Sequence, residues 1–121
     1  MSPPDRARLG DGRDIDVAEP ARDICRRYGE EFPDERDRYG EAWMPWCHHD
    51  NQHVLNWAVE AVSGLTDLEA QLRWLHGVLA ARGFPAERVA RDVAIAADVM
   101  RERGEEAIAE RLAAAAASLP R

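Results

Sequence analysis

The chain has 121 residues, of which 45% are hydrophobic and 32% charged, and its formal net charge is -7. This length suffices for one domain that buries a core without disulfides or metals. The acidic balance excludes nonspecific nucleic-acid binding and adhesion to anionic membranes, because both need a concentrated positive field. We therefore expect neither nucleic acid nor membrane as a partner. All basic residues are arginine and alanine is abundant, which indicates a GC-rich, bacterial coding genome.

The cellular location is predicted from two features of the chain. Residues 1–6 lack the apolar stretch of a signal peptide, and no run approaches the length of a membrane span. The two cysteines, Cys25 and Cys47, lie far apart and form no CxxC motif. A bond between them is left open, but two cysteines are not a secreted disulfide framework. The sequence therefore predicts a cytoplasmic protein.

The N-terminal segment is predicted to be a flexible tail. Residues 1–18 carry Pro, Gly, Asp and Arg with few large apolar side chains. Such a segment buries too little surface to offset its ordering entropy. The alternative is a strap that lies over the domain. Residues 19–121 are then predicted to form a single helical-bundle domain.

Short helices are expected at the start of that domain. Over residues 19–28, Ile24 and Tyr28 share one helical face, and Gly29 is expected to end the helix. Pro33, followed by acidic residues, is typical of a helix start. The helix that it opens carries mixed charges, so we expect a solvated surface there.

Four longer helices follow in the second half of the chain. They are expected over residues 45–63, 66–82, 85–103 and 105–118. Thr66 and Glu69 have the spacing of a capping box at the start of the second of them. Short connections make neighbouring helices antiparallel, and no alternating strand pattern occurs. The sequence predicts an all-α fold, an antiparallel bundle of four main helices with one or two short N-terminal helices and the flexible tail.

Two of these helices carry further signals. The helix after Thr66 has one stripe of leucines and a second apolar pair, Trp74 and Val78, so we expect it to lie at the centre of the bundle. His76 lies off both stripes and is expected to be exposed. The last helix carries the alanine run 113–117, which favours high helix propensity, with a homodimer seam as the alternative.

The segment from Trp43 to Trp57 departs furthest from an ordinary bundle helix, because it combines three histidines, a cysteine, an aspartate and three tryptophans. If it is one helix, each residue advances by about 100°. One face then carries Trp46, His49, His53, Trp57 and Glu60. Asp50 is placed to orient the ring of His53.

This face predicts a binding site. The candidate ligand- or partner-binding residues are Trp43, Trp46, His49, His53, Trp57 and Trp74. Tryptophan offers a large apolar body with one N–H donor, and histidine can orient a ligand in a mostly apolar pocket. The favoured function is a non-enzymatic binding or regulatory module that holds a small apolar ligand or a protein partner. The alternative is that the tryptophans only fill the core, with histidines at its rim.

A second function is a metal or haem site. His49 and His53 have the i, i+4 spacing at which two imidazoles share a metal. Glu60, Cys47 or His76 is the candidate for completing the site. The cofactor would be a transition metal or haem.

Catalysis has little support in the sequence. Residues 49–53 outline H-E-x-x-H with Asp50 in the glutamate position, but the shorter side chain displaces the base from the metal-bound water. No phosphate-binding loop or nucleophile elbow is present. The sequence therefore favours a protein that is not an enzyme.

Overall fold

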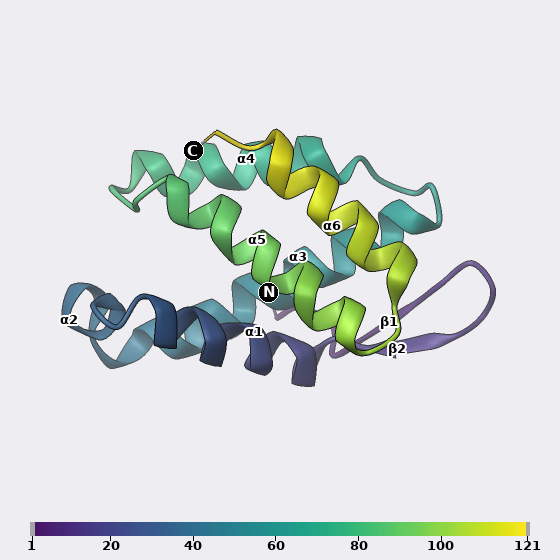
Figure 1. Cartoon of the computed structure of the whole chain (residues 1–121), viewed down its shortest axis with the longest axis horizontal. Helices are drawn as coiled ribbons and strands as arrows, with labels where there is room; N and C mark the ends of the chain where they lie inside the picture. The colour runs from purple at the N-terminus through teal and green to yellow at the C-terminus, as the bar shows by residue number, and fades with distance from the viewer. Residues whose placement is uncertain (1, 121) are drawn as a thin grey trace.

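The computed structural model describes residues 2–120 and is mostly helical (Figure 1). Its helices are α1 (Ala18–Glu31), α2 (Glu35–Tyr39), α3 (Trp43–Val62), α4 (Leu68–Ala81), α5 (Glu87–Glu102) and α6 (Glu106–Ser118), with a 3-10 turn at Gly40–Ala42. The predicted helical character is confirmed. A short helix was expected at the position of α1, but α1 has 14 residues, as many as α4.

The N-terminal segment is a β-hairpin and not a flexible tail. Strand β1 (Arg6–Arg8) pairs antiparallel with β2 (Asp14–Asp16). Leu9, Ile15 and Val17 are buried in the core. The prediction for residues 1–18 is wrong over this part because a hairpin satisfies its own backbone, so a few well-placed apolar side chains suffice to dock it.

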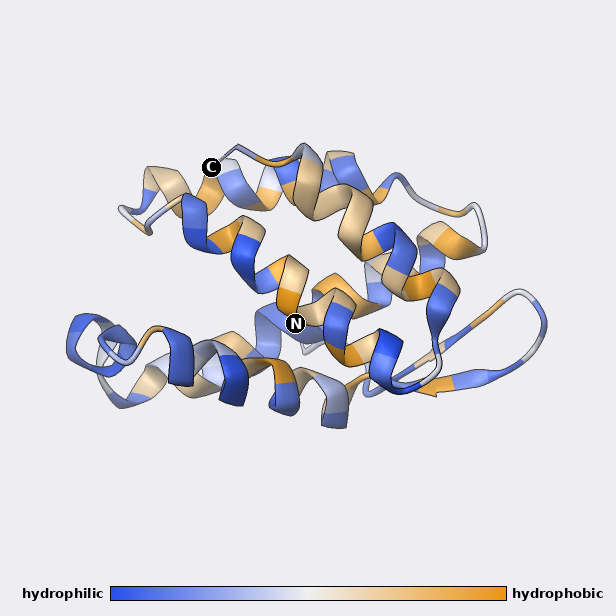
Figure 2. Cartoon of the chain, in the orientation of Figure 1, coloured by the Kyte–Doolittle hydropathy of each residue, from blue (hydrophilic) through white to orange (hydrophobic). Residues whose placement is uncertain are grey.

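The helix α5 packs against α6, α1 and α3. In Figure 1, α6 doubles back along α5, and α1 runs beneath both. α1 also packs against α3. The fully buried side chains include one large residue from each of these helices and from α4: Ile24, Leu55, Leu72, Met100 and Leu112. Figure 2 shows apolar residues recurring along α5 and α6 between hydrophilic ones.

Gly29 and Pro45 neither end nor break a helix, although their residue types suggest that they would. Helix α1 continues through Gly29 to Glu31, so this glycine does not end it. Helix α3 begins at Trp43, and Pro45 lies inside its first turn. The first backbone N–H groups of a helix have no carbonyl partner within it, so a proline is tolerated there and does not break the helix.

The start of α4 is capped by Asp67 and not by Thr66. The Asp67 carboxylate accepts a hydrogen bond of 3.1 Å from the backbone N–H of Ala70. The Thr66 hydroxyl instead accepts one of 3.3 Å from the side chain of Gln71. The predicted helix is present, with its cap displaced by one residue.

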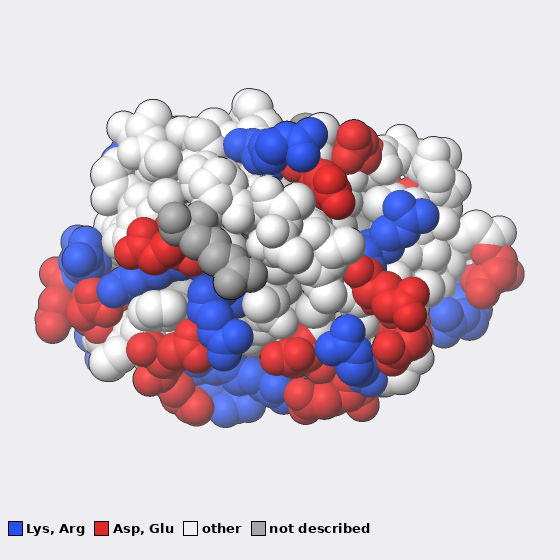
Figure 3. Space-filling view, turned by 45° about the horizontal axis from the view of Figure 1, so that its top comes forward, with Lys and Arg blue, Asp and Glu red and all other residues white. Residues whose placement is uncertain are grey.

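The outer surface near α1 carries interleaved acidic and basic side chains (Figure 3). Arg27 of α1 pairs with Glu102 of α5 at 2.7 Å, and Arg91 of α5 pairs with Glu31 at 2.5 Å. Such exposed pairs stabilise a fold by less than about 1 kcal/mol each. Helix packing at this surface therefore depends on the buried residues. Across residues 2–120, no helix combines the length and apolar character needed to cross a bilayer.

Candidate functional site

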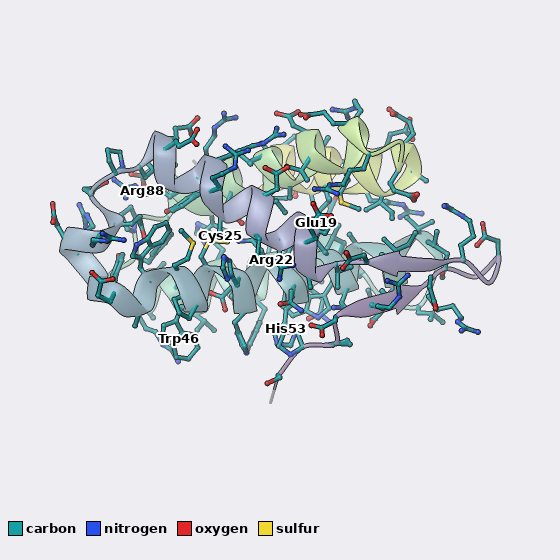
Figure 4. The ribbon with its side chains drawn as sticks, turned by 90° about the horizontal axis from the view of Figure 1, so that it is seen from below. Glu19, Arg22, Cys25, Trp46, His53 and Arg88 are labelled. Atoms are coloured by element: carbon teal, nitrogen blue, oxygen red, sulfur yellow. A yellow bond between two sulfur atoms is a disulfide. The ribbon has the colours of Figure 1, made fainter. Side chains whose placement is uncertain are left out.

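Four rings form a continuous row along one side of α3. Ring centroids are 5.5 Å apart for Trp46 and His49, 4.8 Å for His49 and His53, and 5.9 Å for His53 and Trp57. Figure 4 shows Trp46 and His53 on the side of α3 that faces away from α1. The expected geometry, one continuous helix with these rings on a common side, is present. Their role in binding stays a prediction.

The ring row borders a cavity of about 670 Å³ between α3, α4 and α5. All the candidate binding residues line it: Trp43, Trp46, His49, His53, Trp57 and Trp74. Trp46 and Trp74 are each 61% exposed, so they form the rim of the cavity. Trp43 and Trp57 are partly buried and form its walls. The structure thus gathers indoles from two helices around one space.

Helix α4 is not the central helix that its apolar residues predict. Only Leu68 and Leu72 of this helix are buried. Leu75, Val78 and Leu79 are partly buried and line the cavity. The excess apolar surface of α4 therefore faces the cavity, which is why its hydrophobicity exceeds what the core needs.

The polar floor of the cavity contains Asn51 and Asp92. Asn51 is only 2% exposed. Its Nδ2 donates to Oδ1 of Asp92 at 3.2 Å and to the carbonyl of Cys47 at 3.1 Å. Its Oδ1 is buried and has no hydrogen-bond partner among residues 2–120. A buried acceptor in this state costs about 1–3 kcal/mol, so the site favours a donor from outside the chain.

Asp92 has an unusual acidity for a carboxylate. Burial raises its pKa to about 7. The hydrogen bond from Asn51 lowers the pKa, and the negative charges of Asp50 and Glu35 act in the same direction as burial. Asp92 therefore changes its charge near neutral pH, inside a cavity whose walls are mostly apolar.

Glu35 differs from Asp92 because its charge is compensated. The residue is 3% exposed. It accepts hydrogen bonds from the Tyr28 hydroxyl at 3.0 Å and from Arg88 Nη1 at 2.6 Å. Burial, together with the charge of Glu35, raises the pKa of Tyr28, so the phenol stays a donor. Glu35 belongs to the charged helix after Pro33 that was expected to be a solvated surface. At this residue the prediction is wrong, because Glu35 is buried.

The imidazole of His53, which lines the cavity, favours its neutral form. Burial lowers the pKa of His53, and the neighbouring His49 lowers it too. Asp50 lies against the other ring of the pair, with its Oδ1 3.2 Å from Nδ1 of His49. The sequence placed Asp50 beside His53, so this pairing is a correction. A charge on His49 disfavours a charge on His53, because the two rings lie one helical turn apart.

A disulfide joins Cys25 of α1 to Cys47 of α3 (Figure 4). The side-chain nitrogen of Asn51 lies 3.5 Å from Sγ of Cys25 and 3.4 Å from Sγ of Cys47. The bond thus supports the helix turn that presents Asn51 to the cavity. Disulfides persist in oxidising compartments and are rare in a reducing cytoplasm. This feature argues against the cytoplasmic location, which stays a prediction.

The positions of the proposed ligand side chains give no support to the metal alternative. Within residues 2–120, no group of three or more His, Cys, Asp or Glu side chains is arranged to hold a metal ion. Glu60 is exposed and lies outside the cavity lining, so it does not join His49 and His53 there. His76 is partly buried, contrary to expectation, and its Nε2 is enclosed by protein.

The polar floor was not among the residues predicted from the sequence. Asn51 has helical spacing with Val54, Leu55 and Ala58, so it lies on the buried face of α3. A polar residue in such a row is a signal for a buried polar site. Asp92 of α5 carries the same kind of signal, because it has helical spacing with Val89 and Ala96, which are both buried.

Comparison with protein-family models, with curated proteins and with solved structures gives no match for this chain. The structure defines a small, mostly helical protein with a cavity that has tryptophan walls and a polar floor. Any conclusion about function therefore depends on the cavity itself.

Proposed function

We propose that this chain is a non-enzymatic binding module that holds a small apolar molecule in the cavity between α3, α4 and α5. The observation that carries this proposal is a cavity of about 670 Å³ walled by indole rings and aliphatic side chains. Small-molecule sites usually have volumes of about 300–1,000 Å³, apolar walls and a few convergent polar groups. The polar floor at Asn51 and Asp92 supplies such groups.

A small molecule explains the cavity better than a protein partner does. A partner that docks on the exposed indoles of Trp46 and Trp74 would cover the rim and leave the space behind it empty. Interiors are close-packed, and empty apolar space costs stability in proportion to its volume. A ligand that enters the cavity removes this cost and also covers the two exposed rings.

Three further predictions remain proposals, and the disulfide between Cys25 and Cys47 argues against the second of them. They are the antiparallel arrangement of four main helices, the cytoplasmic location and a homodimer through the alanine face of α6. Binding of a small molecule requires none of them.

The test is a titration with N-phenyl-1-naphthylamine, a neutral probe that fluoresces in apolar surroundings. We expect saturable binding of one probe per chain. Val78 lines the cavity, so Val78→Trp should fill part of it and weaken binding by about tenfold or more. Leu65 is 76% exposed and lies outside the cavity lining, so Leu65→Trp is the matched control. Absence of saturable binding, or equal loss in both variants, would refute the proposed function.

A further inference from the structure

We propose that the ligand carries a protonated amine, held at the floor of the cavity by Asn51 and Asp92 while its apolar body lies against the tryptophan walls. This inference rests on the proposed function and specifies its ligand. It follows from three properties of the cavity: an acceptor without a donor, one carboxylate without a cation, and indole walls.

The first property is the hydrogen-bonding state of the floor. Oδ1 of Asn51 is buried without a partner among the described residues, in a side chain that is 2% exposed and borders the cavity. Asp92 accepts a hydrogen bond only from Nδ2 of Asn51, again among residues 2–120. Both residues thus offer acceptors and need donors. An ammonium group has three N–H donors and no acceptor, so it can serve both at once.

The second property is the charge balance. Arg88 donates to Glu35 at 2.6 Å and to Asp34 at 3.0 Å, so its guanidinium is already engaged. Arg82, which also borders the cavity, is exposed. In the structure, neither arginine pairs with Asp92. A cation therefore finds an uncompensated carboxylate in surroundings of low polarity, where charge-assisted hydrogen bonds are strong. An anion would meet repulsion at the same place.

The third property is the aromatic wall. Trp43 and Trp57 border the cavity and are partly buried. The face of an indole attracts cations, and this attraction strengthens when water is excluded. The same rings bury the apolar body of the ligand. One set of side chains therefore suits both parts of an apolar amine.

Ionisation of Asp92 links binding to pH. The groups that face Asp92 are Asp50 and Asn51 from α3, Glu35 from α2 and Tyr28 from α1, while Arg88 lies on the same helix. Burial raises the pKa of Asp92 to about 7. Near pH 5 the carboxyl is neutral and attracts a cation weakly, whereas near pH 8 it is charged. Affinity for an amine should therefore rise between these values.

The test uses three probes that share one ring system: 2-(1-naphthyl)ethylammonium, 2-(1-naphthyl)ethanol and 1-naphthaleneacetate. Isothermal titration calorimetry at about pH 8 should show the ammonium binding at least tenfold more tightly than the alcohol, with the carboxylate weakest. The preference for the ammonium over the alcohol should shrink near pH 5.

Asp92→Asn is the decisive variant. It keeps the shape of the side chain and removes its charge, so it should reduce the preference for the ammonium by about tenfold and leave binding of the alcohol nearly unchanged. Asp98→Asn, an exposed position on the same helix outside the cavity, is the matched control and should change neither affinity. Circular dichroism checks that both variants fold.

The outcomes separate this inference from the proposed function. Equal affinity for ammonium and alcohol, or an unchanged preference in Asp92→Asn, overturns the amine and leaves the cavity as a site for apolar molecules. If none of these probes nor N-phenyl-1-naphthylamine binds, the proposed function itself is refuted.

Discussion

The indole of Trp43 lies directly against the backbone of Gly29. A Cβ atom built on this glycine would stand 2.6 Å from Cη2 and 3.2 Å from Cζ2 of the ring. Gly29 therefore allows the end of α1 to approach the start of α3. Because Trp43 also borders the cavity, this close approach sets the position of one of its walls.

We expect Gly29→Ala to destabilise the protein by about 1–3 kcal/mol, because the new methyl group displaces the ring of Trp43. Urea denaturation followed by circular dichroism measures the change. Gly77, in the middle of α4, has open space around its ideal Cβ. Gly77→Ala is the control and should stabilise the protein by about 0.5–1 kcal/mol through helix propensity. A stabilising Gly29→Ala would show that the contact with Trp43 is not tight.

The disulfide should contribute measurably to stability. Cys25 and Cys47 are 22 residues apart in the sequence, and a loop of this size lowers the entropy of the unfolded chain by an amount equivalent to about 3 kcal/mol. Dithiothreitol should therefore reduce the free energy of unfolding by about 2–4 kcal/mol. The Cys25→Ala/Cys47→Ala variant should be insensitive to the reductant. An identical urea midpoint with and without dithiothreitol would show that the bond is absent in solution.

The free energy of unfolding should carry the signature of Asp92. Its pKa is about 7 in the folded protein against 3.8 in the unfolded chain. Between these values the folded state binds more protons, so this group makes stability fall as pH rises from about 4 to 7, with no further change above.

The effect of Asp92 has to be measured as a difference between variant and parent chain, because other carboxylates titrate in the opposite sense. Hydrogen bonds from Arg88 and Arg38 lower the pKa of Asp34 to about 2, for example. Asp92→Asn should gain stability relative to the parent chain by roughly 2–4 kcal/mol between pH 4 and pH 8. A difference that does not change with pH would place the carboxyl of Asp92 in contact with solvent.

Arg88 holds a buried charge in place. Arg88→Met would leave the carboxylate of Glu35 with the Tyr28 hydroxyl as its remaining donor, since the guanidinium bond of 2.6 Å is lost. Breaking a buried pair in this way costs about 3–5 kcal/mol. The double variant Arg88→Met/Glu35→Gln should recover part of the loss because the uncompensated charge is removed. Thermal unfolding of the single and double variants tests this, and equal losses in both would mean that the pair is not coupled.

The site was partly predictable because most of its aromatic side chains lie on α3. His49 and His53 are four residues apart, and Trp46 and Trp57 extend the same row, so helical periodicity alone brings these rings together. The polar floor was not predictable in the same way. Asn51 and Asp92 come from different helices, 41 positions apart in the sequence, and meet only when α3 and α5 pack.

Local patterns therefore determined the helical character of the chain, the approximate extent of its longer helices and the ring row on α3. Predictions from these patterns were wrong for the N-terminal hairpin, the position of α4 and the role of Gly29. Each of these features depends on contacts with residues distant in the sequence. Packing decided which apolar residues fill the core and which line a cavity. It also decided that Asp92 ionises near neutrality, because burial and neighbouring charges, and not residue type, set that pKa.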